Sequence, residues 1–313
     1  MTSPGIQEGK LFHTPVLVDA VLQFLITNPS GIYVDGTVGG GGHSEAILKH
    51  LDKDGKLIGI DRDKDAVAYC QNRFSSYAGQ VQILHGELAE IDHLLTEIGV
   101  EQIDGLLLDL GVSSYQIDVP ERGFSYLLDA PLDMRMDRSK GKTARDIVNN
   151  YPEQQLADIF FQYGEERYGR RIAREIIKER KKKPIESTKE LSDLIRKIIP
   201  HRWQIKTLSR VWQALRIEVN DELEQLRIGL KQIFPLLKSG GRIVVLSYES
   251  LTDRMVKRFF RGEEPSFSKK EIGILDSLFS FRVLTRRVVR PTEEEIKRNS
   301  RARSAKLRAA EKV

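Results

Sequence analysis

A run of glycines near the start of the chain is its most specific chemical feature. Residues 34–44 read VDGTVGGGGHS, after one apolar segment and before a helical pattern. Four consecutive glycines, Gly39–Gly42, are costly in backbone entropy, whereas a turn that needs only one positive φ requires one glycine. We therefore expect this backbone to pack closely against a ligand; a merely flexible loop is the alternative. The loop lacks the Gly-Lys-Ser/Thr ending of a P-loop. Its acidic Asp35 favours a ligand with cationic or hydroxyl groups over a pyrophosphate.

Two more aspartates end apolar runs and add to this site. Asp61 ends the second run and Asp109 the fourth. An acidic residue at the end of the second strand of a dinucleotide-type fold accepts hydrogen bonds from ribose hydroxyls. With Asp35, these carboxylates predict a crevice for a nucleoside cofactor that carries a positive centre, such as S-adenosylmethionine. NAD(P) is the alternative, and the absence of a compact GxGxxG motif argues against it. Asp63 is expected to cap a helix.

The elements that must position these residues alternate between strand and helix in the first third of the chain. This alternation predicts βαβ units and a parallel, doubly wound sheet. The predicted strands are 31–35, 56–61, 81–85 and 104–110, with helices over 44–51 and 66–74.

Helical periods alone follow from about residue 116 to 220. They cover 156–163, 169–180, 191–199 and 210–219, and Ser187 with Glu190 forms a capping box. The strand pattern returns at 241–247, after a turn at 238–241, and a strand pair is expected around 281–289. A capping box at Thr292 and Glu295 predicts a helical tail.

We expect an α/β domain in two parts, residues 1–115 and 220–313, with an all-helical insertion at 116–219. The insertion leaves the predicted sheet at the carboxyl edge, where open sheets bind ligands.

Composition and charge exclude several classes of protein. Apolar residues make up 40% and charged residues 30%, which excludes a disordered or fibrous chain. The single cysteine, Cys70, excludes a disulfide framework and fits a reducing cytoplasm. No metal site is predicted, because the histidines include no pair spaced for ligation. No apolar stretch is long enough for a membrane span, and the first residues do not resemble a secretory signal.

Positive charge gathers in two places and indicates a polyanionic partner. The net charge is +5, yet residues 281–313 alone hold 11 Lys and Arg against 4 Asp and Glu. A second basic cluster covers residues 167–183. Such clusters favour nucleic acid, with a solvated helix face as the alternative.

Blocks along nearly the whole chain resemble one known family. They are 13–17 (HTPVL), 35–37 (DGT) with 41–44 (GGHS), 61–63 (DRD), 109–114 (DLGVSS) with Gln116, 121–125 (ERGFS), 131–137 (PLDMRMD), 163–167 (YGEER), 213–217 (QALRI) with Asn220, and 301–308 (RARSAKLR). The chain resembles the bacterial 16S ribosomal RNA (cytosine-N4)-methyltransferase family RsmH, also called MraW. The resemblance implies a Rossmann-like S-adenosylmethionine-dependent methyltransferase with an inserted, substrate-recognising helical domain.

The resemblance also implies a reaction and a set of contacts. The reaction methylates the N4 amino group of a P-site cytidine in 16S rRNA of the small subunit, in the cytoplasm. Two positions depart from the family pattern: Leu88 replaces a phenylalanine, and Glu249 replaces a histidine whose role therefore does not carry over. The implied cofactor contacts are Gly41, Gly42, His43, Asp61, Leu88, Asp109 and Gln116.

Candidate substrate contacts follow from the same blocks and from charge. Asp109 either accepts a proton from the amino group or is occupied by the cofactor. The segment with Ser113 and Ser114 is expected beside the target base, and Phe124 or Tyr126 either stacks on the base or belongs to the core. Asp133, Arg135 and Asp137 either line an RNA cleft or lock a loop. His13 is a cofactor-lid or N-cap residue, whereas Trp203 and Trp212 are expected in the core. The expected phosphate contacts are Arg301, Arg303, Lys306 and Arg308.

Other functions remain open at the level of the sequence. A DNA amino-methyltransferase is disfavoured, because the chain lacks the Asp/Asn-Pro-Pro-aromatic motif of that class. A non-catalytic RNA-binding or ribosome-assembly protein and an NAD-dependent dehydrogenase are further alternatives. The sequence decides neither between monomer and homodimer nor between naked RNA and the assembled subunit as substrate.

Overall fold

The chain forms two compact units. The computed structural model describes residues 15–268, 273–275 and 279–313. The helical unit is Val112–Glu222, and the sheet unit is the described part of Phe12–Gly111 together with Leu223–Val313. The sheet unit therefore consists of two segments that are far apart in sequence. Among the described residues, no helix has both the length and the apolar character that crossing a bilayer requires.

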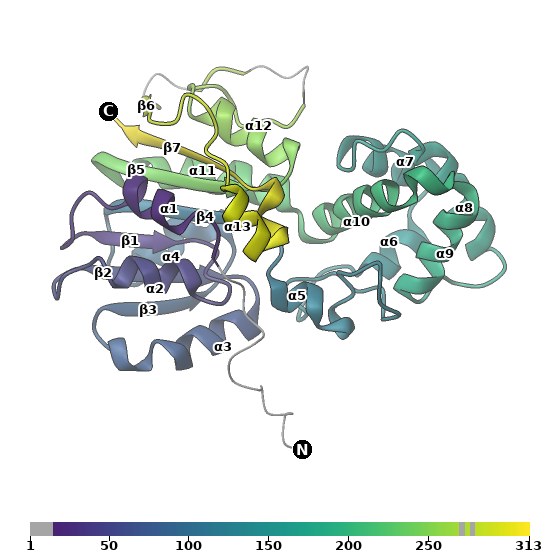
Figure 1. Cartoon of the computed structure of the whole chain (residues 1–313), viewed down its shortest axis with the longest axis horizontal. Helices are drawn as coiled ribbons and strands as arrows, with labels where there is room; N and C mark the ends of the chain where they lie inside the picture. Colours follow the sequence, from purple (N-terminus) through teal and green to yellow (C-terminus); the bar gives the residue numbers. More distant parts are fainter. Residues whose placement is uncertain (1–14, 269–272, 276–278) are drawn as a thin grey trace. The chain divides into compact units, whose positions relative to one another are not determined.

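The described residues of the sheet unit build a seven-stranded sheet in the order β3-β2-β1-β4-β5-β7-β6 (Figure 1). The first five strands in this order are parallel, whereas β7 runs antiparallel to both β5 and β6. The predicted parallel strands are confirmed. Most residues of β4 are buried, as is required of a strand in a sheet that is covered on both faces. The strands are β1 (Ile32–Asp35), β2 (Lys56–Asp61), β3 (Val81–His85), β4 (Ile103–Leu110), β5 (Leu237–Ser247), β6 (Phe281–Val283) and β7 (Lys306–Lys312).

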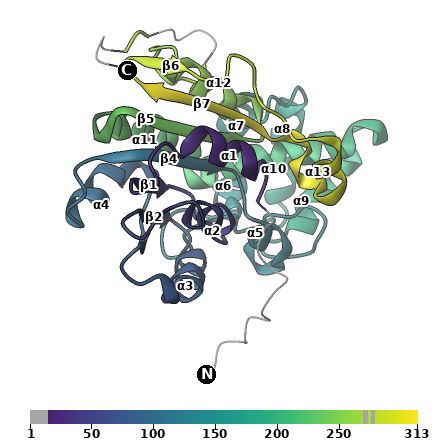
Figure 2. The ribbon, with the colours of Figure 1, turned by 60° about the vertical axis from the view of Figure 1, so that its left-hand side comes forward.

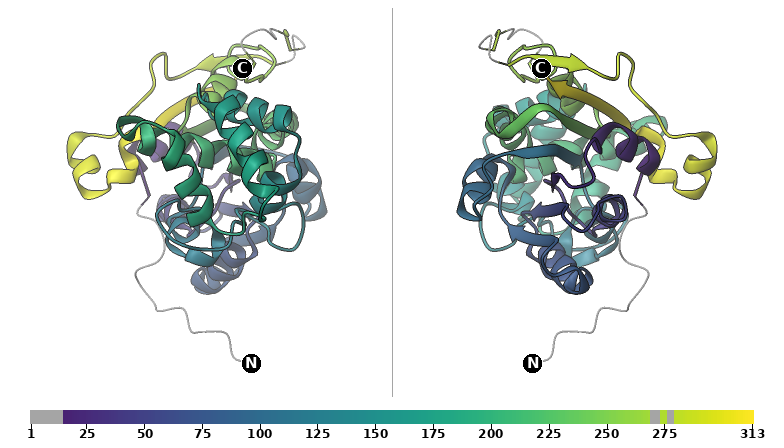
Figure 3. Two further views of the ribbon diagram at one scale, coloured as in Figure 1. Left: turned by 90° about the vertical axis from the view of Figure 1, so that its right-hand side faces the viewer. Right: turned by 90° about the vertical axis from the view of Figure 1, so that its left-hand side faces the viewer.

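Helices cover both faces of this sheet (Figure 2). One face carries α1 (Val18–Leu25), α2 (Gly42–Leu48) and α3 (Lys64–Arg73), and the other carries α4 (Ile91–Glu97), α11 (Glu222–Leu236) and α12 (Ser250–Phe259). The predicted cap of α3 is confirmed, since the Asp63 carboxylate accepts from the backbone N–H of Asp65 at 3.1 Å. Short α13 (Glu293–Arg298) lies beside the start of α1 (Figure 3), where a Glu295 oxygen accepts from the backbone N–H of Leu17.

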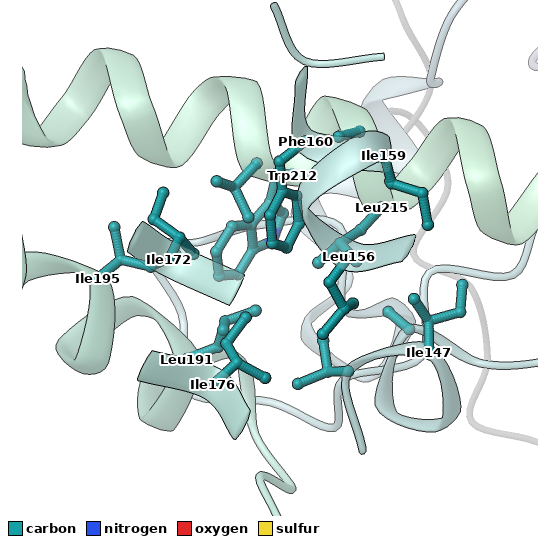
Figure 4. Packing of buried hydrophobic residues seen from close by; sticks show 14 of the residues in the cluster. Ile147, Leu156, Ile159, Phe160, Ile172, Ile176, Leu191, Ile195, Trp212 and Leu215 are labelled. Carbon is teal, nitrogen blue, oxygen red and sulfur yellow. The ribbon is translucent and has the colours of Figure 1, made fainter. Parts of the chain in front are cut away.

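The helical unit has its own hydrophobic core (Figure 4). Trp212 and Phe160 lie at its centre, and half-buried Trp203 packs against it, so the predicted core roles of both tryptophans are confirmed. The predicted capping box also forms: the Ser187 hydroxyl accepts from the N–H of Glu190 at 3.2 Å. The helices are α5 (Ser114–Asp118), α6 (Ala144–Asn150), α7 (Glu153–Gln162), α8 (Gly169–Arg180), α9 (Thr188–Ile198) and α10 (Gln204–Asn220).

Three expectations for the last quarter of the chain were wrong in part. The tail is helical only to residue 304, and residues 306–312 form β7, because pairing with β5 outweighs the helix propensity of Arg and Ala. The expected strand pair around 281–289 does not form; β6 pairs with β7, and Val289 makes a single bridge to Leu307. β5 starts at Leu237 rather than after a turn, with Gly240 at φ 77° inside it.

Candidate functional site

The glycine loop joins β1 to α2, as predicted. Two different constraints, backbone conformation and close packing, require glycine at its positions. Gly39 and Gly41 have φ values of 49° and 75°, which favour glycine. A Cβ on Gly41 would lie 2.8 Å from the ring of Phe74, and one on Gly42 would lie 3.0 Å from Pro15. Gly39 meets only a carbonyl oxygen of the loop at 3.8 Å. Close packing within the protein therefore explains Gly41 and Gly42, whereas a Cβ on Gly39 would meet no described side chain within 4 Å.

Asp35 does not face a ligand, contrary to expectation. Its carboxylate is buried and accepts hydrogen bonds from the Ser44 hydroxyl at 2.7 Å and from the backbone N–H of Thr37 at 3.2 Å. Burial raises the pKa of this carboxyl above its ordinary value, against the lowering effect of these hydrogen bonds. Asp35 thus ties the first turn of α2 to the loop and acts as a structural residue.

Asp61, at the end of the neighbouring strand β2, binds the glycine loop and is half-buried. Oδ2 accepts from the backbone N–H of Gly39 at 2.8 Å, and Oδ1 accepts from that of Asp63 at 2.9 Å. Burial raises its pKa to about 6, and the charges of Asp63 and Asp35 act in the same direction. An ionised carboxylate has about four acceptor positions, so each oxygen of Asp61 can still accept a hydrogen bond from a ligand.

Asp109 ends β4 at the centre of the sheet and has three protein neighbours. Its backbone N–H donates to the Thr37 hydroxyl at 2.6 Å, and its Oδ1 accepts from the Tyr248 hydroxyl at 3.0 Å. Its Oδ2 lies 3.5 Å from Nδ1 of His43 and accepts no hydrogen bond from the described residues. The side chain is 20% exposed. One carboxylate oxygen is therefore available to a ligand.

His43 connects Asp109 to the segment before α1. The ring is buried, and its Nε2 lies 2.9 Å from the carbonyl oxygen of Val16. Since a carbonyl only accepts, Nε2 carries a proton. Both ring nitrogens thus face protein atoms: Nε2 faces the carbonyl oxygen of Val16, and Nδ1 faces Oδ2 of Asp109 at 3.5 Å.

Leu88 fills the space between the glycine loop and α11. A Cβ on Gly229 of α11 would lie 2.4 Å from Cγ of Leu88, and one on Gly36 would lie 3.5 Å from its Cδ1. Leu88 is half-buried and belongs to a short 3-10 turn, Leu88–Glu90. The close approach of α11 fixes the position of this side chain at the loop.

Sequence reasoning missed two residues of this site, Thr37 and Tyr248. Tyr248 follows the carboxyl end of β5, and the rule that ligands bind at this edge of an open sheet was the signal that could have found it. Glu249, the residue that departs from the family pattern, comes next and is the N-cap residue of α12, without a side-chain capping bond.

The remaining candidates near the start of the helical unit have structural partners there. Ser113 and Gln116 form a reciprocal capping box at the start of α5, and the Gln116 side chain is buried. Phe124 is buried in the core cluster, which favours the packing role over stacking on a base. Arg135 donates to both oxygens of Asp133, at 2.8 and 3.0 Å. This pair fits the loop-locking alternative. Ser114 is the first residue of α5.

The expected phosphate contacts in the tail differ in exposure. Arg301 and Arg303 are exposed in a short 3-10 helix, Ser300–Ser304, whereas Lys306 is half-buried at the start of β7. Arg308 donates to both oxygens of Asp253, at 2.7 and 3.2 Å, so its charge is largely neutralised. His13 lies outside the described residues. Within the described part of the chain, no group of three or more His, Cys, Asp or Glu side chains is arranged to hold a metal ion.

The sequence comparisons with known proteins agree on one family. The sequence profile of the MraW methylase family matches residues 10–313. Proteins named ribosomal RNA small subunit methyltransferase H are similar to the chain over 96% of its length. They include those of Caldicellulosiruptor saccharolyticus (46% identical, 99% of that protein covered), Geobacter sp. strain M21 (48%, 98% covered) and Chlorobaculum parvum (47%, 98% covered). The crystal structure of an rRNA methylase from Streptococcus thermophilus has a TM-score of only 0.42 at 13% identity, over 95% of this chain and 93% of that one.

Proposed function

Because the chain belongs to the MraW methylase family, we propose that it is an S-adenosylmethionine-dependent methyltransferase of small-subunit ribosomal RNA. Its target is the exocyclic N4 amino group of a P-site cytidine in 16S rRNA, the substrate that its sequence blocks imply. The observation that carries the proposal is the acidic carboxyl edge of the sheet, where Asp61 and Asp109 stand beside the glycine loop. We expect this activity in the cytoplasm, where small ribosomal subunits are assembled.

The residues at this edge fit S-adenosylmethionine. The cofactor has ribose hydroxyls, an ammonium group and a sulfonium, and it lacks the phosphates that basic side chains would bind. Asp61 is a half-buried acceptor whose raised pKa results from the cost of burying its charge, and hydroxyl donors would offset that cost. No described side chain lies within 4 Å of a Cβ on Gly39, which leaves room for a ligand against the loop backbone. Leu88 supplies an apolar surface in place of the family's phenylalanine.

The two carboxylates of the site have different roles, one in cofactor binding and one in proton transfer. Asp61 accepts hydrogen bonds from the ribose, as acidic residues at this strand position do. Asp109 is the candidate proton acceptor, because its Oδ2 accepts no hydrogen bond from the described residues while the Tyr248 hydroxyl holds Oδ1 in place. When bound, S-adenosylmethionine supplies an electrophilic methyl group.

The target amino group is a weak nucleophile, because its lone pair is delocalised into the ring. N4 must lose a proton as it gains the methyl group that the cofactor's sulfonium would release, with the thioether as leaving group, and the free oxygen of Asp109 would accept that proton. Positioning of the base relative to the methyl group supplies much of the remaining acceleration. A base inside a helix cannot reach such a site, so the substrate must present the cytidine unstacked.

The test is methylation of small ribosomal subunits that lack this modification. The pure protein is incubated with labelled S-adenosylmethionine, and the nucleosides of the digested RNA are identified by mass spectrometry. We expect N4-methylcytidine at one P-site position. Methylation of another nucleoside, or none despite measurable cofactor binding, would overturn the proposal.

The role of Asp109 needs its own variants. Asp109→Asn and Asp109→Ala are expected to lower turnover by about 10²–10⁴-fold, the usual contribution of a positioned acid or base. Calorimetric titration with S-adenosylmethionine shows whether each variant still folds and binds. An Asp109→Ala enzyme with full turnover would remove Asp109 from the mechanism.

A further inference from the structure

The basic residues of the helical unit fall into two groups that the sequence does not separate. One group is already neutralised by neighbouring carboxylates: Lys178 by Glu175 at 3.0 Å, Lys182 by Glu179 at 3.1 Å, and Lys183 by Glu190 at 2.8 Å. The other group is exposed and has no ion pair with any described residue; it comprises Arg138, Lys142, Arg167, Arg170, Arg171, Lys181, Lys197, Arg202 and Lys206. Only the second group offers uncompensated positive charge to a partner.

Two members of the unpaired group are held by the same indole ring. The guanidinium carbon of Arg167 lies 4.5 Å from the ring centroid of Trp203, and that of Arg202 lies 5.6 Å from it. Arg167 also lies 5.1 Å from the ring of Tyr168. Trp203 is half-buried and packs against the core of the helical unit, which restricts its motion. The ring is therefore a fixed platform for two long, otherwise flexible side chains.

Stacking leaves the hydrogen-bond donors of both arginines available. A guanidinium that lies on an aromatic face keeps its planar fork of N–H groups, and this fork matches a phosphate in bidentate geometry. Lys206 comes four residues after Arg202, across the join of the 3-10 helix His201–Trp203 with α10, and both side chains are exposed. Next to Arg167 in the sequence, Glu166 is buried 3.8 Å from Arg210, and Glu165 is exposed.

We propose that Arg167, Trp203, Arg202 and Lys206 form a clamp for the phosphate backbone of the ribosomal RNA substrate. The inference rests on the proposed function and adds to it a binding surface remote in sequence from the basic tail. Pre-ordered, unpaired arginines favour RNA over an acidic protein surface, because phosphates repeat along the chain and each releases counterions when it is bound. The clamp contributes affinity rather than sequence specificity.

The test is the salt dependence of binding to unmodified 16S rRNA transcribed in vitro. Full-length protein is titrated into labelled RNA between 50 and 300 mM KCl, and the slope of log K against log salt is compared among variants. For Arg167→Gln with Arg202→Gln we expect the slope to flatten by about 1.4, since each lost contact to single-stranded RNA accounts for about 0.7. We expect affinity at 150 mM KCl to fall at least tenfold.

Two further variants separate the clamp from general charge. Lys178→Gln with Lys182→Gln removes the same number of charges from the same unit, but from paired lysines, and we expect the parent slope and affinity. Arg167→Lys keeps the charge and loses the planar fork, so its affinity should fall between those of the parent and the double arginine variant. Unchanged calorimetric binding of S-adenosylmethionine shows that each variant is folded.

The outcomes that contradict the clamp are distinct from failure of the proposed function. If the double arginine variant binds RNA with the slope and affinity of the parent, or if the paired lysines matter equally, the clamp is wrong. If that variant fails only on assembled subunits and binds naked RNA normally, the surface contacts a ribosomal protein and the RNA assignment is wrong. If the parent itself methylates no small-subunit RNA, the proposed function fails instead.

Discussion

Removal of one hydroxyl, in Tyr248→Phe, tests how the acidic edge is held together. The Tyr248 hydroxyl donates to Oδ1 of Asp109 over 3.0 Å. Burial, followed by the charge of Asp109, raises the pKa of Tyr248 far above its ordinary value, so the hydroxyl stays a donor over the working pH range. The ring packs over Gly111, where a Cβ would lie 3.3 Å away, and phenylalanine preserves that contact.

The size of the effect follows from the charge and exposure of the acceptor. A hydrogen bond to a charged group contributes about 1.5–3 kcal/mol. Asp109 is 20% exposed, so water replaces part of the lost bond, and we expect the free energy of unfolding to fall by about 1.5 kcal/mol. In a unit of about 190 residues, this lowers the melting temperature by about 3–6 °C. Scanning calorimetry of the purified protein measures the change.

Tyr77→Phe is the matched control for this variant. Tyr77 is half-buried and packs edge-on against Phe74, with ring centroids 6.2 Å apart, and its hydroxyl bonds to none of the described residues. We expect its stability to change by less than about 0.5 kcal/mol. Equal melting temperatures for Tyr248→Phe and the parent, or an equal loss in the control, would refute the assigned role of Tyr248.

Three more predictions concern the same unit. The affinity for S-adenosylmethionine should fall as the pH drops below about 6, because Asp61, with its pKa raised to about 6, loses the charge that accepts the ribose hydroxyls; a constant calorimetric Kd from pH 5 to 8 would contradict this. Arg308→Ala should lower the free energy of unfolding by about 2 kcal/mol, because it leaves the largely buried Asp253 without its bidentate donor, and urea unfolding that matches the parent would refute it. Gly229→Ala should destabilise the unit by about 1–3 kcal/mol and weaken cofactor binding, since the new Cβ would lie 2.4 Å from Leu88; normal stability and normal binding together would show that Leu88 moves freely.

Local signals predicted most of the parallel sheet and part of the site. The strands up to β4 were predicted to within a residue at each end, because a strand covered on both faces is apolar at successive positions. Asp61 was predicted as a ligand-facing acceptor; its carboxylate is half-buried beside Gly39, and its contact with a ligand stays a prediction. The motif blocks identified the family without any knowledge of the fold.

Burial and partners that the fold supplies account for what local signals missed. Asp35 has the same residue type and strand position as Asp61, yet its carboxylate is only 2% exposed and is bonded to Ser44 and Thr37, so it does not reach the surface of the site. Tyr248 meets Asp109 across 139 residues of sequence. The prediction of a helical tail failed because β5, more than 50 residues earlier, offers β7 an unpaired edge.

The sequence by itself determined the order of strands and helices, the glycine loop, the acidic ends of the strands and the family, because each depends on neighbouring residues or on residue identity. The tertiary structure decided which charges are available. Arg308 and Lys178 are neutralised by carboxylates, whereas Arg167 and Arg202 stack on Trp203 with their donors exposed. The amino-acid composition does not distinguish the paired basic residues from the unpaired ones. Their different roles arise because hydrogen bonds, stacking and burial depend on which side chains the fold brings within a few ångströms of one another.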